Sequence, residues 1–399
     1  MPHRARQSFR CSAVLASHAI LSLCLLFAEA ALPAAAVAAE KSSDASPIDT
    51  LALLESKKYT ELERHYAARQ RSYEDGAITE EALYKDFRTL YEDSVDNEQY
   101  FTGWVSAFPK SYSARMARGA YYYRMGWFVR GKQFISRTPR GQLMQMDEYL
   151  GKARDDLSAS LKLSGRPYLS TLYLLNVSML IGEAEETRRW LDVGTKLDPR
   201  NILLRIRYMV SLQPRWGGSH QQMKAFLDEC VDQKLPQRSI ARLELTFLRE
   251  VADALSKDSP ASERYEIWSK VRRAEQDAGQ PASVEAVMRQ TRAAWDLQRV
   301  DEANRGLQQL SRMNVEAAWV LSQMAMIHAR QGRHKEAWPL LLKAAEKKDP
   351  WAQFGVGKAF YSGVPEVGIK PDQTVGLEWI RRAAAQQHAE AQAFLRSLN

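Results

Sequence analysis

The chain has 399 residues, of which 45% are hydrophobic and 26% are charged, and its formal net charge is +8. This length is sufficient for two ordinary domains or for one long solenoid. Two of the three cysteines, Cys11 and Cys24, lie in the N-terminal segment 1–39. Removal of that segment would leave Cys230 alone, which excludes an internal disulfide in the mature chain.

The segment 1–39 has the pattern of a secretory signal peptide. Arginines at positions 4, 6 and 10 precede an apolar stretch at 13–28, and Val37-Ala38-Ala39 precedes Glu40. An uncleaved membrane anchor is the alternative, but the apolar stretch is short for a span and contains a histidine. We therefore expect a signal peptide at 1–39, a polar tether at 40–47, a periplasmic or secreted location, and no stable membrane span after cleavage.

The charge of the mature chain bears on its partner. Removal of the segment 1–39 takes away three arginines and one glutamate and leaves a net charge of +6. Such an excess would suggest nucleic acid in a cytosolic protein, but an exported protein rarely meets it. We therefore expect a protein or peptide partner, acidic in character, with an envelope polymer as the alternative, and no nucleic acid.

A repeat period of about 34 residues, counted along the sequence, relates several segments of the chain. A shift by one period places Arg299, Glu302, Ala303 and Leu307 on Arg333, Glu336, Ala337 and Leu341. The segment 317–350 reads as two helices joined by a left-handed turn at Gly332, a conformation that glycine adopts without a steric penalty. Two helices in each period are typical of the tetratricopeptide repeat, so we predict an all-α solenoid of stacked helix-turn-helix units.

Before the regular repeats, the sequence predicts helices whose apolar residues are less regularly spaced. Residues 48–91 predict two or three helices with Thr79 as an N-cap, and 101–108 predicts a short one that Pro109 ends. The next helix is rich in aromatic residues. By the register of the repeat, Gly119 marks a close approach of two helices and Gly126 marks the turn.

The partner helix of this unit is delayed. Its apolar pattern resumes only at Leu150, which leaves a basic insertion from Trp127 to Glu148 that contains Arg130, Lys132, Arg137 and Arg140. We interpret the insertion as a solvated loop, with a binding surface as the alternative. Further along, the turn after residue 212 is replaced by Pro214-Arg215-Trp216-Gly217-Gly218-Ser219, in which we expect Trp216 to pack on a helix pair and Ser219 to cap the next helix.

Residues 237–278 predict two helices outside the repeat register, with linkers at 256–262 and 278–282. They separate two blocks. The predicted divisions are the signal peptide, the tether, a helical domain with degenerate repeats at 48–235, a connector at 236–281, and tetratricopeptide/SEL-like repeats at 282–399.

Two resemblances support this organisation. Residues 352–391 resemble a SEL-like repeat through Gly357, Gly363, Asp372, Gly376, Trp379 and Ala383-Ala384, although extra residues precede Asp372 and Gln387 stands where a glycine usually ends the helix. Residues 50–235 resemble a bacterial domain family of unknown function. The residues that carry this second resemblance are Trp104 with Pro109, Ala117-Arg118-Gly119 with Tyr121-Tyr122, Arg130-Gly131, and Pro214–Ser219. It implies an exported helical protein and a special role for those positions, without a known activity.

The sequence offers no catalytic or metal-binding pattern above background. The histidines after residue 39 have no second histidine at metal spacing, and there is no Cys-x-x-Cys, phosphate loop or nucleophile elbow. Asp155-Asp156 is interpreted as a charge pair on a solvated helix face, and Cys230 as a buried apolar-like thiol. No cofactor is expected.

We therefore predict a non-catalytic scaffold that binds a protein or peptide through the concave face of a helical superhelix. The residues expected to contact the partner are aromatic and basic, and the alternative for several of them is packing between repeats: Tyr123, Arg124, Arg130, Arg215, Trp216, Arg292, Trp295 and Arg330. The second hypothesis is an enzyme of unrecognised type, with its site at the 127–148 insertion and the 214–219 loop. An immunity or inhibitor protein against a secreted toxin is a special case of the first.

Overall fold

The structure, a computed structural model, describes residues 49–91, 96–131, 137–256 and 258–398. The predicted signal peptide, the predicted tether and Lys132 lie outside these described residues. Within them the chain forms nineteen α-helices and short 3₁₀ turns, and an isolated β-bridge joins Val364 to Ile369. The predicted all-α class is therefore confirmed.

The first four helices form a group that packs against the later hairpins, with α2 on α5 and α3 on α7. Thr79 caps the third of them as predicted, because its side chain accepts a hydrogen bond from the N–H of Ala82 at 3.2 Å. The bounds of the group are α1 Thr50–Glu55, α2 Tyr59–Glu74, α3 Glu80–Arg88 and α4 Glu98–Ala107.

The rest of the chain is a series of antiparallel helix pairs that ends in one extra helix. In chain order the pairs are α5 Tyr112–Arg130 with α6 Arg140–Ser160, α7 Tyr168–Leu180 with α8 Ala184–Leu197, α9 Leu203–Ser211 with α10 His220–Asp232, α11 Gln237–Ala254 with α12 Ala261–Asp277, α13 Val284–Asp296 with α14 Val300–Ser311, α15 Ala318–Arg330 with α16 His334–Glu346, and α17 Pro350–Ser362 with α18 Gln373–Ala385. The last helix is α19 Ala389–Arg396.

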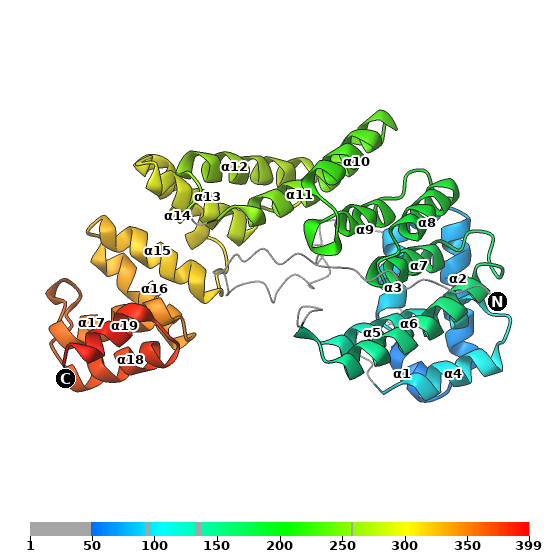
Figure 1. Cartoon of the computed structure of the whole chain (residues 1–399), viewed down its shortest axis with the longest axis horizontal. Coiled ribbons are helices and arrows are strands. Elements are labelled where there is room, and N and C mark those ends of the chain that lie inside the picture. Colours follow the sequence, from blue (N-terminus) through cyan, green and yellow to red (C-terminus); the bar gives the residue numbers. More distant parts are fainter. Residues whose placement is uncertain (1–48, 92–95, 132–136, 257, 399) are drawn as a thin grey trace, which may run out of the picture.

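The pairs stack in the manner of a solenoid. First helices contact first helices of neighbouring pairs in α5–α7, α7–α9, α9–α11 and α13–α15, and second helices contact the first helix of the next pair in α6–α7, α8–α9, α10–α11, α12–α13 and α16–α17. Contact between successive first helices brings that side of the stack closer together, so we place the first helices on the inner side of the curve. Figure 1 shows the resulting arch, with α1–α9 in one arm, α10–α14 across the top and α15–α19 in the other arm.

The buried hydrophobic residues that the structure describes form four clusters along the arch. The largest core extends from Leu54 in α1 to Leu243 in α11, and a second core is formed by α11, α12 and Ala286 of α13. Helix α11 thus contributes to both. The predicted linkers do fall between α11, α12 and α13, but loss of the sequence register at residues 237–278 does not interrupt the packing. Among the described helices, none has both the length and the apolar character needed to cross a bilayer.

The prediction for the insertion is wrong in two respects. Gly126 is not a turn but lies inside α5, where an added Cβ would approach Leu150 Cδ2 to 3.2 Å. The turn falls instead at Gly131, whose φ is +72°. Most of the described part of the 127–148 insertion is therefore helical, because it lengthens α5 and α6 to 19 and 21 residues rather than forming a long loop. The extended end of this hairpin points away from its own arm, toward the side of the opposite arm (Figure 1).

Candidate functional site

The last turn of α5 meets the 3₁₀ turn η2 Pro214–Trp216, although the two segments are far apart in the sequence. The Trp127 and Trp216 rings touch edge to face with their centroids 6.1 Å apart. This is the contact that joins the two segments suspected from the sequence. The predicted packing of Trp216 on a helix pair is confirmed, since both rings are half-buried against the large core.

Two glycines make η2 possible. Gly217 has a φ of +89°, in the left-handed region that favours glycine. A Cβ on Gly218 would lie 2.1 Å from the backbone oxygen of Leu212, so no other residue fits there without moving the backbone. Ser219 then caps α10 by accepting from the N–H of Gln222 at 3.2 Å, as predicted. The sequence Pro214–Ser219 is thus a tight turn that carries Trp216 to α5.

Arg130 completes this contact. Its guanidinium lies 5.0 Å from the centroid of the Trp127 ring, and burial lowers the pKa of Arg130 below its usual value. On the other side, the Trp127 indole N–H donates to the Tyr123 hydroxyl at 2.8 Å. We call Tyr123, Trp127, Arg130 and Trp216 the aromatic–arginine cluster. Tyr123 itself is buried and forms the floor of the cluster rather than a contact surface.

Arg215 fixes the turn to the next hairpin. Its Nη2 atom lies 2.5 Å from Glu250 Oε2 on α11, and the Glu250 side chain is only 11% exposed. The interaction holds η2 between α5 and α11. A partner would therefore meet Arg215 as part of an existing ion pair.

The remaining predicted site residues lie elsewhere. Arg292 on α13 donates to Asp296 Oδ1 at 2.9 Å and to Gln323 at 2.7 Å, and Trp295 packs on the core of the later hairpins. Arg330 is exposed at the end of α15, and Arg124 is half-buried on α5. The structure thus brings Tyr123, Arg130, Arg215 and Trp216 together. The other predicted residues, Arg292, Trp295 and Arg330, lie on helices that follow α11 in the chain.

An ion pair that the sequence interpretation missed holds α5 on α6. Asp155 is exposed, but Asp156 is buried, and Arg118 Nε and Nη2 bind its two carboxylate oxygens at 2.6 and 2.8 Å. The interpretation of both aspartates as a solvated pair was wrong for Asp156, because the next residue on a helix points about 100° away and here faces α5. Gly119 lets the helices approach, since a Cβ there would lie 2.7 Å from Leu157.

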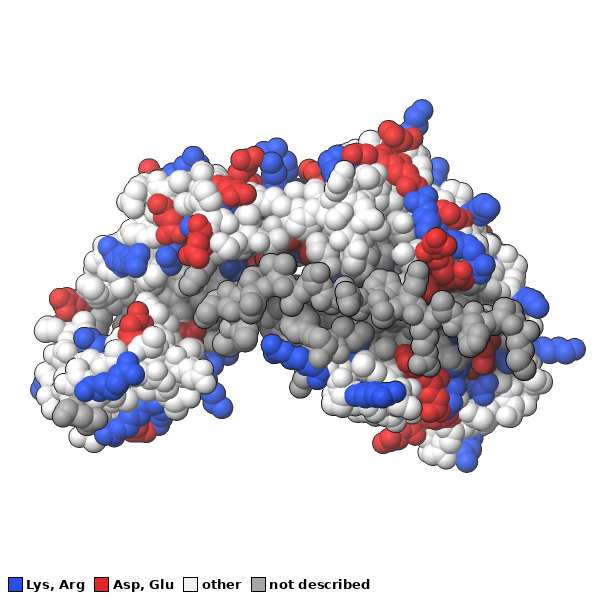
Figure 2. Space-filling view, viewed as in Figure 1, with Lys and Arg blue, Asp and Glu red and all other residues white. Residues whose placement is uncertain are grey.

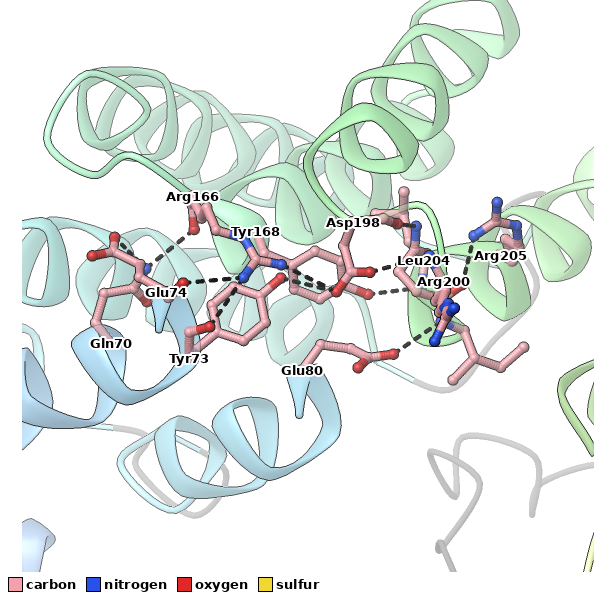
Figure 3. Close-up of polar contacts among 12 residues, drawn as sticks. Gln70, Tyr73, Glu74, Glu80, Arg166, Tyr168, Asp198, Arg200, Leu204 and Arg205 are labelled. Carbon is pink, nitrogen blue, oxygen red and sulfur yellow. Dashed lines mark hydrogen bonds and ion pairs between the residues drawn. The ribbon is translucent and has the colours of Figure 1, made fainter. Parts of the chain in front are cut away.

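Polar side chains also tie α2 and α3 to two later loops (Figure 3). The Tyr73 hydroxyl donates to Asp198 Oδ2 at 3.3 Å, while the Arg166 guanidinium stacks over the Tyr73 ring at 4.5 Å. Arg166 Nη1 donates to the backbone oxygen of Tyr73 at 3.1 Å. Glu80 Oε1 accepts from the N–H of Ile202 at 3.0 Å. We call Tyr73, Glu74, Glu80, Arg166 and Asp198 the polar staple.

The polar staple holds the first helices against the hairpins that carry η2. Gln70 extends it by donating to Glu74 Oε1 at 3.0 Å and to the backbone oxygen of Arg166 at 3.1 Å (Figure 3). Burial raises the pKa of Tyr73, and it also raises the pKa of Glu80. Little in the sequence indicated this network. Its two loop members are charged residues placed directly before Pro167 and Pro199.

The cluster contains groups that can hold a ligand. Indole rings, a guanidinium and a fixed ion pair bind by stacking, hydrogen bonding and charge. In the part of the chain that the structure describes, no group of three or more His, Cys, Asp and Glu side chains is placed to hold a metal ion. Cys230 is buried as predicted, and burial raises the pKa of its thiol to about 11.

Comparison with known proteins identifies a family but no activity. No curated protein matches the chain. A family model matches residues 48–186 and 182–248, a span that contains the polar staple, the Arg118–Asp156 pair and the aromatic–arginine cluster. The chain therefore belongs to the family described as a domain of unknown function, DUF4034.

Proposed function

We propose that this protein is a non-catalytic scaffold, exported to the periplasm, that binds a protein or peptide partner on the inner face of its arch. The single observation that carries the proposal is that first helices contact one another in two runs, α5–α7–α9–α11 and α13–α15, so that each run presents a shared face along the arch (Figure 1). Helical arrays of this kind use such faces to hold extended partners. The helical-repeat fold and the family are consistent with this role.

The test is recovery of a defined complex. The mature chain, used as bait in an envelope extract of a bacterium that encodes it, should retain a partner that co-elutes with it at a fixed ratio in size-exclusion chromatography with light scattering. Arg330→Glu on α15 should weaken the complex, and Arg312→Glu at the end of the second helix α14 serves as the matched control. Arg292 is unsuitable for this test because it already binds Asp296 and Gln323.

Two outcomes would count against the scaffold. One is that no envelope protein co-elutes with the mature chain. The other is that the retained protein binds the charge-reversal variant Arg330→Glu as tightly as it binds the wild type. Export itself is tested by the mass of the periplasmic form, which should begin at Glu40 if the segment 1–39 is removed.

A second candidate function is an enzyme with its site where α5 meets η2. The observation in its favour is the Trp127–Trp216 contact, which brings the two suspected segments together. If it is an enzyme, incubation of the protein with an envelope metabolite extract should deplete a compound. That depletion should be lost in Trp216→Ala and kept in Trp338→Ala, a half-buried tryptophan on α16. Unchanged extracts would leave the scaffold as the better account.

A further inference from the structure

A cavity lies where α2 meets the turn between α4 and α5, within the arm α1–α9 (Figure 1). It has a volume of about 390 Å³, it is open to solvent, and its lining residues are Glu63, Ala107, Phe108, Pro109, Lys110 and Ser111. Trp104 and Pro109, which carry part of the resemblance to the family, both belong to this region. Neither the aromatic–arginine cluster nor the polar staple explains a special role for these two positions.

Glu63 of α2 is the acid of this cavity, and two buried donors fix one of its oxygens. The Trp104 indole N–H donates to Glu63 Oε2 at 2.9 Å, and the Ser111 hydroxyl donates to the same oxygen at 2.7 Å. Ser111 is itself held as the N-cap of α5, because its hydroxyl accepts from the N–H of Ala114 at 3.0 Å. Both donors are neutral, so they orient the carboxylate and leave its negative charge in place.

The chain does not balance this negative charge. Among the described residues, no basic side chain lies within ion-pair distance of Glu63, and its Oε1 atom accepts no hydrogen bond. Oε1 is also absent from the buried polar atoms that lack a partner, so it is accessible in the cavity. On the face drawn in Figure 2, by contrast, acidic and basic side chains are interspersed. A cationic group of a ligand can therefore bind Glu63 without displacing an ion pair.

A positive charge stands at the same cavity. Lys110 is exposed, and within the described residues no carboxylate lies within ion-pair distance of its ammonium group. The side chains of residues 107–109 are an alanine, a phenylalanine and a proline, which give the cavity an apolar wall. The cavity thus combines an oriented carboxylate, an ammonium group and an apolar surface.

Hydrogen bonds hold the wall in place. The N–H of Ser111 donates to the backbone oxygen of Phe108 at 3.0 Å, and Arg115 Nε donates to the backbone oxygen of Pro109 at 3.1 Å. The turn between α4 and α5 is therefore fixed before a ligand arrives, and binding does not require ordering of the backbone.

We propose that this cavity binds a free α-amino acid with an apolar side chain. The ammonium group of the amino acid would bind Glu63, its carboxylate would pair with Lys110, and its side chain would cover Phe108. The volume is at the lower end of the range for small-molecule sites, which suits a ligand of this size. This inference goes beyond the scaffold function and does not depend on it, because it requires no protein partner.

Isothermal titration calorimetry of the mature chain with L-leucine and two analogues tests each charge separately. Isopentylamine is leucine without the carboxylate, and isocaproate is leucine without the ammonium group. We expect L-leucine to bind, and each analogue to bind at least about tenfold more weakly, because each lacks one charge-assisted contact. L-Phenylalanine should also bind, whereas L-aspartate should bind more weakly than either, because its side chain places a second negative charge near Glu63.

Two variants assign the contacts. Glu63→Gln keeps an oxygen for Trp104 and Ser111 but removes the charge, so leucine should bind at least about tenfold more weakly. Lys110→Ala should weaken leucine at least about threefold and leave isopentylamine unchanged, because only leucine has a carboxylate. The matched controls are Glu61→Gln and Lys85→Ala, two exposed residues on α2 and α3, which should change the affinity less than about twofold. Circular dichroism checks that each variant is folded.

Three results would overturn the proposal. One is that neither leucine nor phenylalanine binds at about 10 mM, a concentration that detects even millimolar affinity. Another is that folded Glu63→Gln binds leucine as tightly as the wild type. The third is that isopentylamine binds as tightly as leucine and Lys110→Ala changes neither, which would make the ligand a simple amine. None of these results bears on the scaffold, which is tested by recovery of a complex.

Discussion

The two arms of the arch are built from the same helix pairs but differ in how they are held together. In the arm α15–α19, which we call the regular arm, the helices α15 to α18 have 13 residues each. In the arm α1–α9, which we call the irregular arm, the helices α5 to α9 have 19, 21, 13, 14 and 9 residues. The regular arm buries small and aliphatic side chains. The irregular arm buries Trp104 and several tyrosines and adds the polar staple and the Arg118–Asp156 pair.

The difference shows where a repeat is free to specialise. Equal helices pack through small residues and close approach, so each unit can be exchanged for the next. Helices of unequal length leave side chains that no neighbouring repeat covers, and these must be fixed by aromatic packing or by buried polar contacts. In this protein the unequal helices are also those that carry the aromatic–arginine cluster. Four substitutions test whether the two arms depend on different contacts.

The largest effect is expected for Trp104→Ala. The side chain is fully buried, and its indole N–H donates to Glu63 Oε2 at 2.9 Å. Loss of this ring should cost about 3–5 kcal/mol of unfolding free energy, mainly from the cavity, because Glu63 Oε2 keeps a hydrogen bond from the Ser111 hydroxyl at 2.7 Å. The matched variant in the regular arm is Trp338→Ala, whose ring is half-buried and should cost only about 1–2 kcal/mol.

Urea unfolding followed by circular dichroism measures both variants. Hydrogen exchange with mass spectrometry then assigns the loss to an arm, because a helical array can unfold in parts. Similar losses for the two tryptophans would show that the arms do not differ in their dependence on large aromatic side chains.

The second largest effect is expected for Arg118→Ala, which leaves the Asp156 carboxylate buried without its bidentate partner. We expect a loss of about 2–3 kcal/mol, less than for a fully buried pair because the Arg118 side chain is 18% exposed and Arg115 lies 3.5 Å from Asp156. The double variant Arg118→Ala with Asp156→Ala should recover part of the loss. A double-mutant cycle in urea measures the coupling, and a coupling near zero would reject the pair as a determinant of the irregular arm.

The regular arm should instead be sensitive to added volume at its helix crossings. In α18, a Cβ at Gly376 would lie 2.6 Å from the backbone nitrogen of Tyr361 and 2.8 Å from the backbone oxygen of Gly357. Backbone atoms cannot rotate away, so Gly376→Ala should cost about 1–3 kcal/mol. Gly151→Ala in α6 is the control: nothing lies within 4 Å of the added carbon, and the alanine should stabilise the helix by about 0.5–1 kcal/mol. Thermal unfolding measures the change in melting temperature of both variants. Equal shifts would show that close approach of the helices does not explain the sensitivity of Gly376.

The regular arm was also the part of the fold that its sequence predicted best. The repeat period and the turn at Gly332 are confirmed, and Gly357 and Gly376 of the SEL-like pattern lie where two helices approach closely. Turn geometry was harder to foresee where no glycine marks it. Gln387, a departure from the SEL-like pattern, still adopts a φ of +65°, as do Gln298 and Lys348 at +60° and +67°. Packing of the neighbouring helices imposes this conformation on residues that do not favour it.

The irregular arm was predicted less well, and for reasons that lie in long-range contacts. Gly126 was assigned to a turn because the repeat register was extended into helices that do not obey it. Asp156 was assigned to the surface because its partner, Arg118, is distant in the sequence. The sequence did single out Arg130, Arg215 and Trp216, but their meeting depends on how α5 and α11 are stacked. Whether these residues bind a partner stays a prediction.

The smallest expected effect concerns Glu80 in the polar staple, and it depends on pH. Burial raises the pKa of Glu80, and the charges of Asp198 and Glu81 raise it further. The folded chain therefore holds this proton more tightly than the unfolded chain, so stability is highest below the ordinary carboxyl pKa and declines as pH rises through the raised value. Glu80→Gln cannot ionise but keeps an oxygen for the N–H of Ile202. Relative to the wild type it should gain stability between pH 4 and pH 7, by less than about 1 kcal/mol. Urea midpoints at the two pH values measure this gain, with the exposed Glu244→Gln on α11 as control. If the variant loses stability relative to the wild type as pH rises, or matches the control at both pH values, then burying the Glu80 charge does not destabilise the folded chain. The polar staple would in that case resemble the apolar packing of the regular arm.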